Sequence, residues 1–388
     1  MNIYLDNAAT TPIDEEVYEA MIPVLKEDFG NPSSTHSYGR KIKSYIERAR
    51  KNVAKHLNCS TGEIFFTSGG TEADNMAIRC AVRDLGVKHI ITSKIEHHAV
   101  GHTVKKLVKK RKVDVSFVRI NKKGHIDLSH LDELLMKNPN SLVSLMHANN
   151  EIGNLLPLED VSLICKKHSA FFHSDTVQTI GHYDFDMKQM NEIHFMACSA
   201  HKFHGPKGVG FLYVNKNINI NPLIHGGSQE RNMRGGTENV YGIVGLSKAM
   251  DVSLNKLIKH RKHIVNLKKH MLYRLNKSIP GVSFNGDCEN LSASLYTLLS
   301  VSLPPVEIAS MILFNMDIMG VACSGGSACS SGANIGSHVL ENLKTPIDRP
   351  TIRFSFSKMN TIQEIDFAVD SLVKLYSRFE AKQNIISV

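Results

Sequence analysis

Residues 63–75 read EIFFTSGGTEADN, and this stretch decides the fold. Its first five residues, 63–67, are typical of a short strand. The glycine pair that follows lets the backbone turn closely, and the residues after it open a helix. Further short apolar runs, each followed by polar, glycine-rich or helical sequence, lie at 89–92, 113–118, 142–146 and 170–173. Strands that alternate with helices predict an α/β fold with a mostly parallel sheet covered by helices on both faces.

The chain changes character after about residue 255. A long basic amphipathic helix is expected over 256–277, followed by strands near Val282 and over 295–303. A last helix should begin after Thr361, because Glu364 three residues later completes a capping-box pattern. We therefore predict a large domain over 12–255 and a smaller α+β domain formed by 1–11 and 256–388.

Composition narrows the class of protein. The chain has 388 residues, of which 42% are hydrophobic, so it can bury a sizeable core. No apolar run of about 18 residues predicts a membrane span, and the N-terminus lacks the pattern of a secretory signal. The seven cysteines are scattered without a C-x-x-C pair, which argues against a disulfide framework or a structural zinc site. We expect a cytoplasmic protein that binds no metal.

The net charge is +9, and one stretch of the chain is the most densely basic. Residues 105–112 hold six lysines or arginines in eight positions. The plain interpretation is a solvated helix face, and the alternative is a docking surface for an acidic protein or for RNA. No nucleic-acid module accompanies this stretch and aromatic residues are sparse, so the sequence does not favour direct binding of nucleic acid.

Two turns at strand ends could hold a charged ligand. Residues 67–75 combine glycines, hydroxyls and a helix start, which suits a phosphate, although an ordinary turn capped by Ser68 or Thr71 would look the same. Residues 172–178 read FHSDTVQ, where an apolar strand ends in Asp175. In open α/β sheets, ligands bind at this end of the strands, and an acid there can hold a protonated pyridine nitrogen. The alternative is again a helix cap.

A lysine and a cysteine supply candidate reactive groups. Lys202 lies in SAHKFHGPKG at 199–208, and such a lysine can form a Schiff base or can simply be a surface residue. Cys329 lies in SGGSACSSG at 324–332, a small polar loop in which a thiol is accessible and partly ionised at neutral pH. Cys323 follows an apolar run and is expected to be a buried structural cysteine, with pairing to Cys329 as the alternative.

These sites, in this order, resemble one family. The chain resembles the cysteine desulfurases of the NifS/IscS type, within the fold-type I (class V aminotransferase) pyridoxal-phosphate enzymes. The match runs from YLDNAATTP at 4–12 to about Phe356. It includes FGNPSS at 29–34, EHHAV at 96–100, HANNEIG at 147–153, RGGTEN at 234–239 and IRFS at 352–355. The lysine motif reads Ser-Ala-His-Lys where the family often has Ser-Gly-His-Lys.

The resemblance implies a role for each matching residue. Lys202 would carry pyridoxal phosphate and move protons at substrate carbons, and Asp175 would pair with the pyridine N–H. His97, rather than His98, would stack on the ring, and Gln178 would bond its phenolic oxygen. The phosphate would be held by Gly70, Thr71, Ser199, His201 and, reaching across to the other subunit of a homodimer, Thr237. The substrate would be held by Asn31, by Asn150, which also contacts the cofactor, and by Arg353.

The implied activity is the conversion of L-cysteine to L-alanine with a persulfide left on Cys329. An acceptor protein would then take the sulfur for iron–sulfur cluster assembly, another thio-cofactor or tRNA thiolation. The alternative enzyme is a selenocysteine lyase or another class V lyase. The alternative of another class is a docking platform without catalysis. The sequence does not identify the acceptor.

Overall fold

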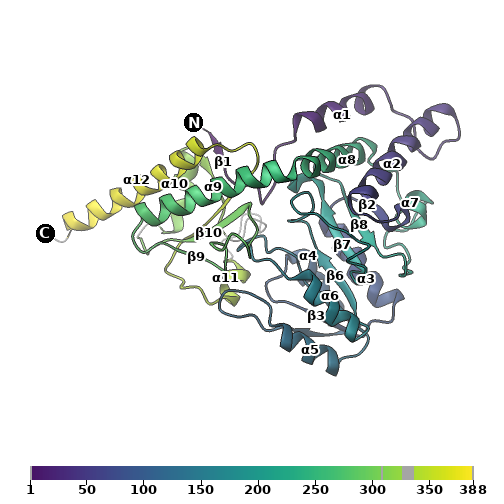
Figure 1. The fold of residues 1–388 in the computed structure, drawn as a ribbon, viewed down its shortest axis with the longest axis horizontal. Helices are drawn as coiled ribbons and strands as arrows, with labels where there is room; N and C mark the ends of the chain where they lie inside the picture. The colour runs from purple at the N-terminus through teal and green to yellow at the C-terminus, as the bar shows by residue number, and fades with distance from the viewer. Residues whose placement is uncertain (1, 307–308, 326–335, 387–388) are drawn as a thin grey trace.

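The structure is a computed structural model that describes residues 2–306, 309–325 and 336–386, with side chains described up to residue 377. Figure 1 shows a large part built around one sheet and a smaller part that carries both chain termini. Among the helices of the described residues, none combines the length and the apolar character needed to cross a membrane.

The large part contains a seven-stranded sheet, and only β8 runs against the other strands. This confirms the predicted mostly parallel sheet. From edge to edge the strands are β2 (Ile64–Thr67), β8 (Gly210–Val214), β7 (Phe195–Ser199), β6 (Phe171–Asp175), β5 (Ser141–Ser144), β3 (His89–Thr92) and β4 (Asp114–Phe117).

Helices cover both faces of this sheet. Successive side chains of a strand point to opposite faces of the sheet. In β7, Met196 belongs to one apolar cluster while Phe195 and Ala197 belong to another, and all three are fully buried, so both faces are covered. The helices of the large part are α1 (Glu15–Lys26), α2 (Ser37–His56), α3 (Gly70–Asp84), α4 (His98–Lys109), α5 (Leu128–Lys137), α6 (Leu158–Lys167), α7 (Gln229–Asn232) and α8 (Val240–Asn255).

The smaller part joins the two ends of the chain. Ile3 and Leu5 are buried in the same apolar cluster as residues between Ile264 and Tyr376, and α9 and α12 lie side by side (Figure 1). The boundaries at 11 and 255 remain predictions. Its elements are β1 (Ile3–Tyr4), α9 (Leu257–Ser278), β9 (Ser283–Phe284), β10 (Leu298–Ser302), α10 (Ile312–Ile318), β11 (Val321–Ala322), α11 (His338–Asn342), β12 (Thr351–Ser355) and α12 (Ile362–Ile386).

Local signals located most of these elements. The capping box at the start of α12 is present: Thr361 N–H donates to Glu364 Oε2 at 2.8 Å, and Glu364 N–H donates to Thr361 Oγ1 at 3.3 Å. The strand that contains the apolar run at 170–173 ends at Asp175, as predicted, because Ser174 and Asp175 pair with β7. Polar residues therefore continue a strand whose apolar run has already ended.

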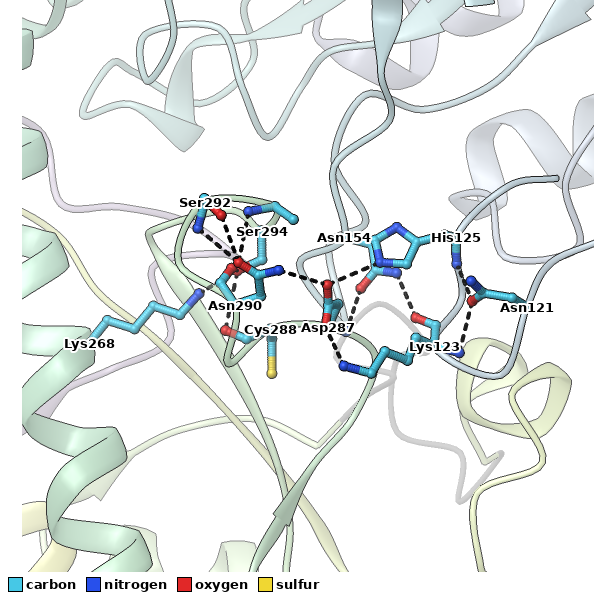
Figure 2. Close-up of polar contacts among 11 residues, drawn as sticks. Asn121, Lys123, His125, Asn154, Lys268, Asp287, Cys288, Asn290, Ser292 and Ser294 are labelled. Carbon is cyan, nitrogen blue, oxygen red and sulfur yellow. Dashed lines mark hydrogen bonds and ion pairs between the residues drawn. The ribbon is translucent and has the colours of Figure 1, made fainter. Parts of the chain in front are cut away.

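A polar network connects the two parts (Figure 2). Asp287 accepts hydrogen bonds from Lys123 Nζ at 2.7 Å, and its backbone N–H donates to Asn154 Oδ1 at 2.9 Å. Beside it, the buried Lys268 of α9 donates to Ser294 Oγ at 2.9 Å, and burial lowers the pKa of Lys268 to about 8. The Asp287 contacts join the smaller part to the loops after β4 and β5, whereas the Lys268 contact lies within the smaller part.

Candidate active site

The carboxyl ends of β5, β6 and β7 open onto a cavity of about 210 Å³. Parallel strands of an α/β sheet bring their ends, and the loops after them, to one edge. Of the predicted site residues that the structure describes, all except Asn31 and Thr237 line this cavity. Its lining consists of Ala8, Ala9, Gly70, Thr71, Asp74, His97, Met146, Asn150, Asp175, Val177, Gln178, Ser199, His201, Lys202 and Arg353.

Lys202 reaches the cavity from a 3-10 turn, Ala200–Lys202, directly after β7. Its Nζ donates to the carbonyl of Ala8 at 2.7 Å and to that of Ala9 at 2.9 Å. These two backbone carbonyl oxygens help to orient the amine at the wall of the cavity. A lysine amine in such a cavity suits proton transfer and Schiff-base chemistry.

Asp175 forms the acidic side of the cavity. It is 5% exposed, and Oδ1 accepts the backbone N–H of Val177 at 2.9 Å. Burial raises the pKa of Asp175 to about 6, although that hydrogen bond and the charge of Lys202 act in the other direction. Close by, Gln178 Nε2 donates to Ala8 O at 3.0 Å. A buried carboxylate that still ionises near neutral pH suits a positively charged ring nitrogen.

The start of α3 forms the anion-binding side. The cap residue is Gly69, with φ of 148° and no side-chain hydrogen bond, so the alternative of a cap by Ser68 or Thr71 is wrong. The first N–H groups of this helix are therefore not satisfied by a cap side chain. The Thr71 and Ser199 side chains line the cavity beside this helix start. The arrangement suits a phosphate.

Of two neighbouring histidines, His97 lines the cavity and His98 does not. His97 is the N-cap of α4, lines the cavity, and accepts the Ala99 N–H on Nδ1 at 3.2 Å. Burial, and then the charge of Lys202, lower the pKa of His97 to about 4, so its ring is neutral at pH 7. His98 instead stacks on His102, with ring centroids 4.7 Å apart. His97 is thus the ring available to stack on a ligand.

Arg353 supplies the cationic side from β12. It is 1% exposed, Nη1 donates to Asn150 O at 2.8 Å, and Nη2 donates to Asp6 Oδ1 at 2.8 Å. A planar guanidinium matches a carboxylate with two parallel hydrogen bonds. The distribution of charge therefore suits a ligand with a carboxylate at one end of the cavity and a phosphate at the other.

Sequence reasoning missed a second buried acid. Asp74 lines the cavity and is 1% exposed, with Oδ1 3.3 Å from His173 Nε2. Burial and the neighbouring Asp175 raise the pKa of Asp74 well above its ordinary range. Asp74 follows Gly70 by four residues on α3, so helical periodicity could have placed it on the same face as the phosphate turn.

Among the residues that the structure describes, two predicted site residues do not line this cavity. Asn31 is exposed, and its Oδ1 accepts the N–H of Ser33 at 2.9 Å. Thr237 is exposed and lies in a separate hollow with Ser68. Cys329 lies outside the described residues.

Two further expectations concern residues beyond the cavity. Cys323 packs against the apolar core of the smaller part, and burial raises its pKa to about 12, as for a structural cysteine. Its alternative pairing with Cys329 involves a residue that the structure does not describe. All six basic side chains of residues 105–112 are exposed, but only Lys105, Lys106 and Lys109 lie on α4, so the predicted helix face accounts for half of them. Whether they dock a partner stays a hypothesis.

The donors fit the cofactor that the resemblance implies. The cavity offers an amine for an aldehyde, an acid for a pyridine nitrogen, and hydroxyls with a helix start for a phosphate. Gly70 makes the close packing possible, because a Cβ there would come within 2.4 Å of Val177 Cγ2. Pyridoxal phosphate would thus be held by Lys202, Asp175 and the residues around Thr71.

The turn after β5 also holds the start of α11. Ser337 is the N-cap of α11, and its hydroxyl donates to Oε2 of the buried Glu151. Glu151 directly follows Asn150, so this bond ties the substrate side of the cavity to the segment after residue 335. Burial raises the pKa of Glu151 to about 7, while the Ser337 hydrogen bond and the charge of Arg353 lower it.

Glu151 should therefore make stability depend on pH. Its folded pKa of about 7 exceeds the ordinary 4.5, so the folded state binds the extra proton between these values. The stabilisation is complete below pH 4.5 and is lost as the pH rises through 7. We expect the unfolding free energy of the native protein, relative to Glu151→Gln, to fall by about 2 kcal/mol between pH 5 and pH 8. Urea denaturation at both pH values measures it.

The exposed Glu159 provides the control for that experiment, because Glu159→Gln should leave the difference between pH 5 and pH 8 unchanged. A native protein and a Glu151→Gln variant with parallel pH profiles would show that Glu151 titrates at an ordinary pKa.

Comparisons with known proteins agree with this geometry. The sequence model described as aminotransferase class-V matches residues 3–367. A protein named cysteine desulfurase IscS, from Dictyoglomus turgidum, is 42% identical over 383 residues, which cover 97% of this chain and 95% of that protein.

Solved structures show the same fold. One titled NifS-like protein superposes with a TM-score of 0.89 at 37% identity, covering 97% of this chain and all of that one. Another, titled SspA in complex with cysteine, has a TM-score of 0.79 at 32% identity and covers 92% of this chain and all of that one. These similarities extend over both parts of the fold.

Proposed function

The chain belongs to the aminotransferase class-V family, and we propose that it is a pyridoxal-phosphate-dependent cysteine desulfurase. It converts L-cysteine to L-alanine and leaves the sulfur as a persulfide on Cys329. One observation carries the proposal: a single cavity brings together the amine of Lys202, the buried carboxylate of Asp175 and the buried guanidinium of Arg353.

When bound, pyridoxal phosphate supplies an electron sink for charge that develops at the substrate Cα. The protein side chains then divide the work. Asp175 is the anion that favours a proton on the ring nitrogen, because burial leaves it few other partners. His97 offers a neutral ring to stack on the cofactor. Neither residue has to move a proton to the substrate.

Lys202 is the residue that moves protons. Its amine contacts the carbonyls of Ala8 and Ala9, from where it can take the proton of the substrate Cα and later supply a proton to the carbon that loses its sulfur. Arg353 grips the α-carboxylate, which holds the substrate Cα near that amine. Positioning and proton transfer thus come from the two parts of the fold.

The thiolate of Cys329 performs the sulfur step. It attacks the substrate sulfur, so a sulfur–sulfur bond forms while the bond between Cβ and sulfur breaks. The electron pair of the broken bond stays with the carbon, which takes up a proton and leaves as L-alanine. A persulfide remains on Cys329, and an acceptor protein or thiol takes its outer sulfur for cluster assembly, cofactor synthesis or tRNA thiolation.

The assembly is proposed to be a homodimer in the cytoplasm. The exposed position of Thr237, in a hollow beside the phosphate turn, supports a second subunit on that face. Asn31 is also exposed and would join the substrate site only through a rearrangement or a neighbouring subunit.

Product analysis tests the proposed function. The purified protein with bound pyridoxal phosphate should form L-alanine from L-cysteine, with one sulfide released per alanine when a thiol reductant is present. L-selenocysteine is the comparison substrate, since turnover of it without turnover of L-cysteine would favour a selenocysteine lyase. A protein that binds no cofactor and forms no alanine would favour the docking platform.

A further inference from the structure

The N-terminal segment brings an acid to Arg353. Ser355 N–H donates to Leu5 O at 2.7 Å, and Asp6 forms a parallel bridge with Ser355. This register extends the smaller sheet by one segment and places Asp6 alongside β12. As a result, Asp6 Oδ1 lies 2.8 Å from Arg353 Nη2.

The guanidinium of Arg353 keeps unused donors. It has five N–H groups. Within the described part of the chain, Nη1 donates to Asn150 O, Nη2 donates to Asp6, and the buried Nε–H has no hydrogen-bond partner. An unsatisfied buried donor costs free energy, so a group that lines a cavity and keeps one is suited to a ligand. Three N–H groups remain for that ligand, on Nε, Nη1 and Nη2.

The backbone of Arg353 is held independently of these contacts. Its N–H donates to Ser324 O at 2.6 Å, and it pairs with Ser300 across the sheet. A long side chain on a fixed backbone still has several rotamers. The orientation of the guanidinium therefore depends on the two groups that hold its ends, Asn150 O and the Asp6 carboxylate.

We propose that Asp6 is a positioning residue, which holds one end of the Arg353 guanidinium so that its remaining N–H groups present a two-point grip to the α-carboxylate of an amino-acid substrate. The inference rests on the proposed function. Asp6 also supplies the opposite charge that a buried guanidinium needs while no substrate is bound.

The same segment also contacts Lys202. Two and three residues after Asp6, the carbonyls of Ala8 and Ala9 accept hydrogen bonds from the amine of Lys202. One short stretch therefore contacts both the group that receives the substrate carboxylate and the group that acts at its Cα. Asp6 thus helps to set the position of Arg353 relative to Lys202.

Positioning and simple charge competition predict opposite results. If Asp6 only competed with the substrate carboxylate, its removal would tighten binding of carboxylate ligands. If Asp6 positions the guanidinium, its removal weakens the binding of carboxylate ligands. Asp6→Ala removes both the charge and the acceptor oxygen, whereas Asp6→Asn keeps an acceptor oxygen at the same place.

Ligand binding to the protein with bound pyridoxal phosphate provides the test. L-alanine and ethylamine differ only in the carboxylate, and both are followed through the absorption of the cofactor. We expect Asp6→Ala to weaken the binding of L-alanine about tenfold and Asp6→Asn to weaken it only about threefold, with the binding of ethylamine unchanged in both. A loss specific to the carboxylate is one that general disruption of the site would not produce.

The proposal is overturned if Asp6→Ala binds L-alanine as tightly as the native protein or tighter, or if ethylamine weakens equally. Should Asp6→Ala fail to fold, Asp6→Asn alone decides: L-alanine must weaken measurably while ethylamine does not, and any other pattern rejects positioning. The native protein is the separate check on the proposed function, since absence of cofactor absorption there would reject that function without bearing on the contact between Asp6 and Arg353.

Discussion

Lys202→Ala should lower the rate of alanine formation from L-cysteine by about 10⁴-fold. The variant loses the amine that we propose both anchors the cofactor and moves the proton at the substrate Cα. The methyl side chain of alanine can perform neither role. Amino-acid analysis measures the alanine, and the absorption spectrum of the purified variant should lack the band of the lysine-bound cofactor.

Lys207 is the matched control. It lies in the same glycine-proline turn, five residues along the chain, and is exposed. Lys207→Ala should therefore keep the cofactor spectrum and most of the activity. If Lys202→Ala kept more than a tenth of native activity, Lys202 would not be the residue that transfers the proton.

Cys329→Ala should reduce sulfide release by about 100-fold or more while leaving the cofactor spectrum unchanged. The reason is chemical: without a thiolate to accept the sulfur, the bond between Cβ and sulfur has no nucleophile to break it. Sulfide and alanine are measured together in the presence of a thiol reductant, because both must fall in parallel if one step produces them.

Cys323→Ala separates that effect from a general loss of cysteine. Cys323 lies six residues earlier, in the core of the smaller part, and burial keeps it protonated. This variant should keep native sulfide release. If Cys329→Ala kept its activity and Cys323→Ala lost it, the nucleophile would be Cys323 and not Cys329.

The features that the sequence predicted are those that depend on neighbouring residues in the chain. A strand that ends in Asp175, a glycine pair before α3 and a lysine after β7 are each decided by their immediate neighbours. Because the fold is a mostly parallel sheet, these strand ends had to meet at one edge. Ten predicted residues therefore line a single cavity although they lie far apart in the chain.

Contacts between distant segments could not be predicted in this way. The bond from Lys202 to Ala8 O joins residues 194 apart, and that from Arg353 to Asp6 joins residues 347 apart. Backbone carbonyls of alanine carry no sequence signal, and Asp6 appeared only as part of a family motif. The pairing of Asp74 with His173 likewise depends on how α3 lies across β6.

The predicted roles of Asn31 and Thr237 are not tested by the structure of a single chain. Their predicted roles came from resemblance alone, and one chain leaves both exposed. A residue that acts in the site of another subunit does not contact that site within its own chain. Both roles stay proposals until the assembly is determined.

Mapping the sulfur by mass spectrometry tests the central claim most directly. The native protein with bound pyridoxal phosphate is incubated with L-cysteine without reductant, alkylated and digested. The account predicts one additional sulfur atom on the peptide containing Cys329, in an amount equal to the first alanine formed. Alanine formed with no sulfur on Cys329, or with the sulfur on a different cysteine, would contradict it.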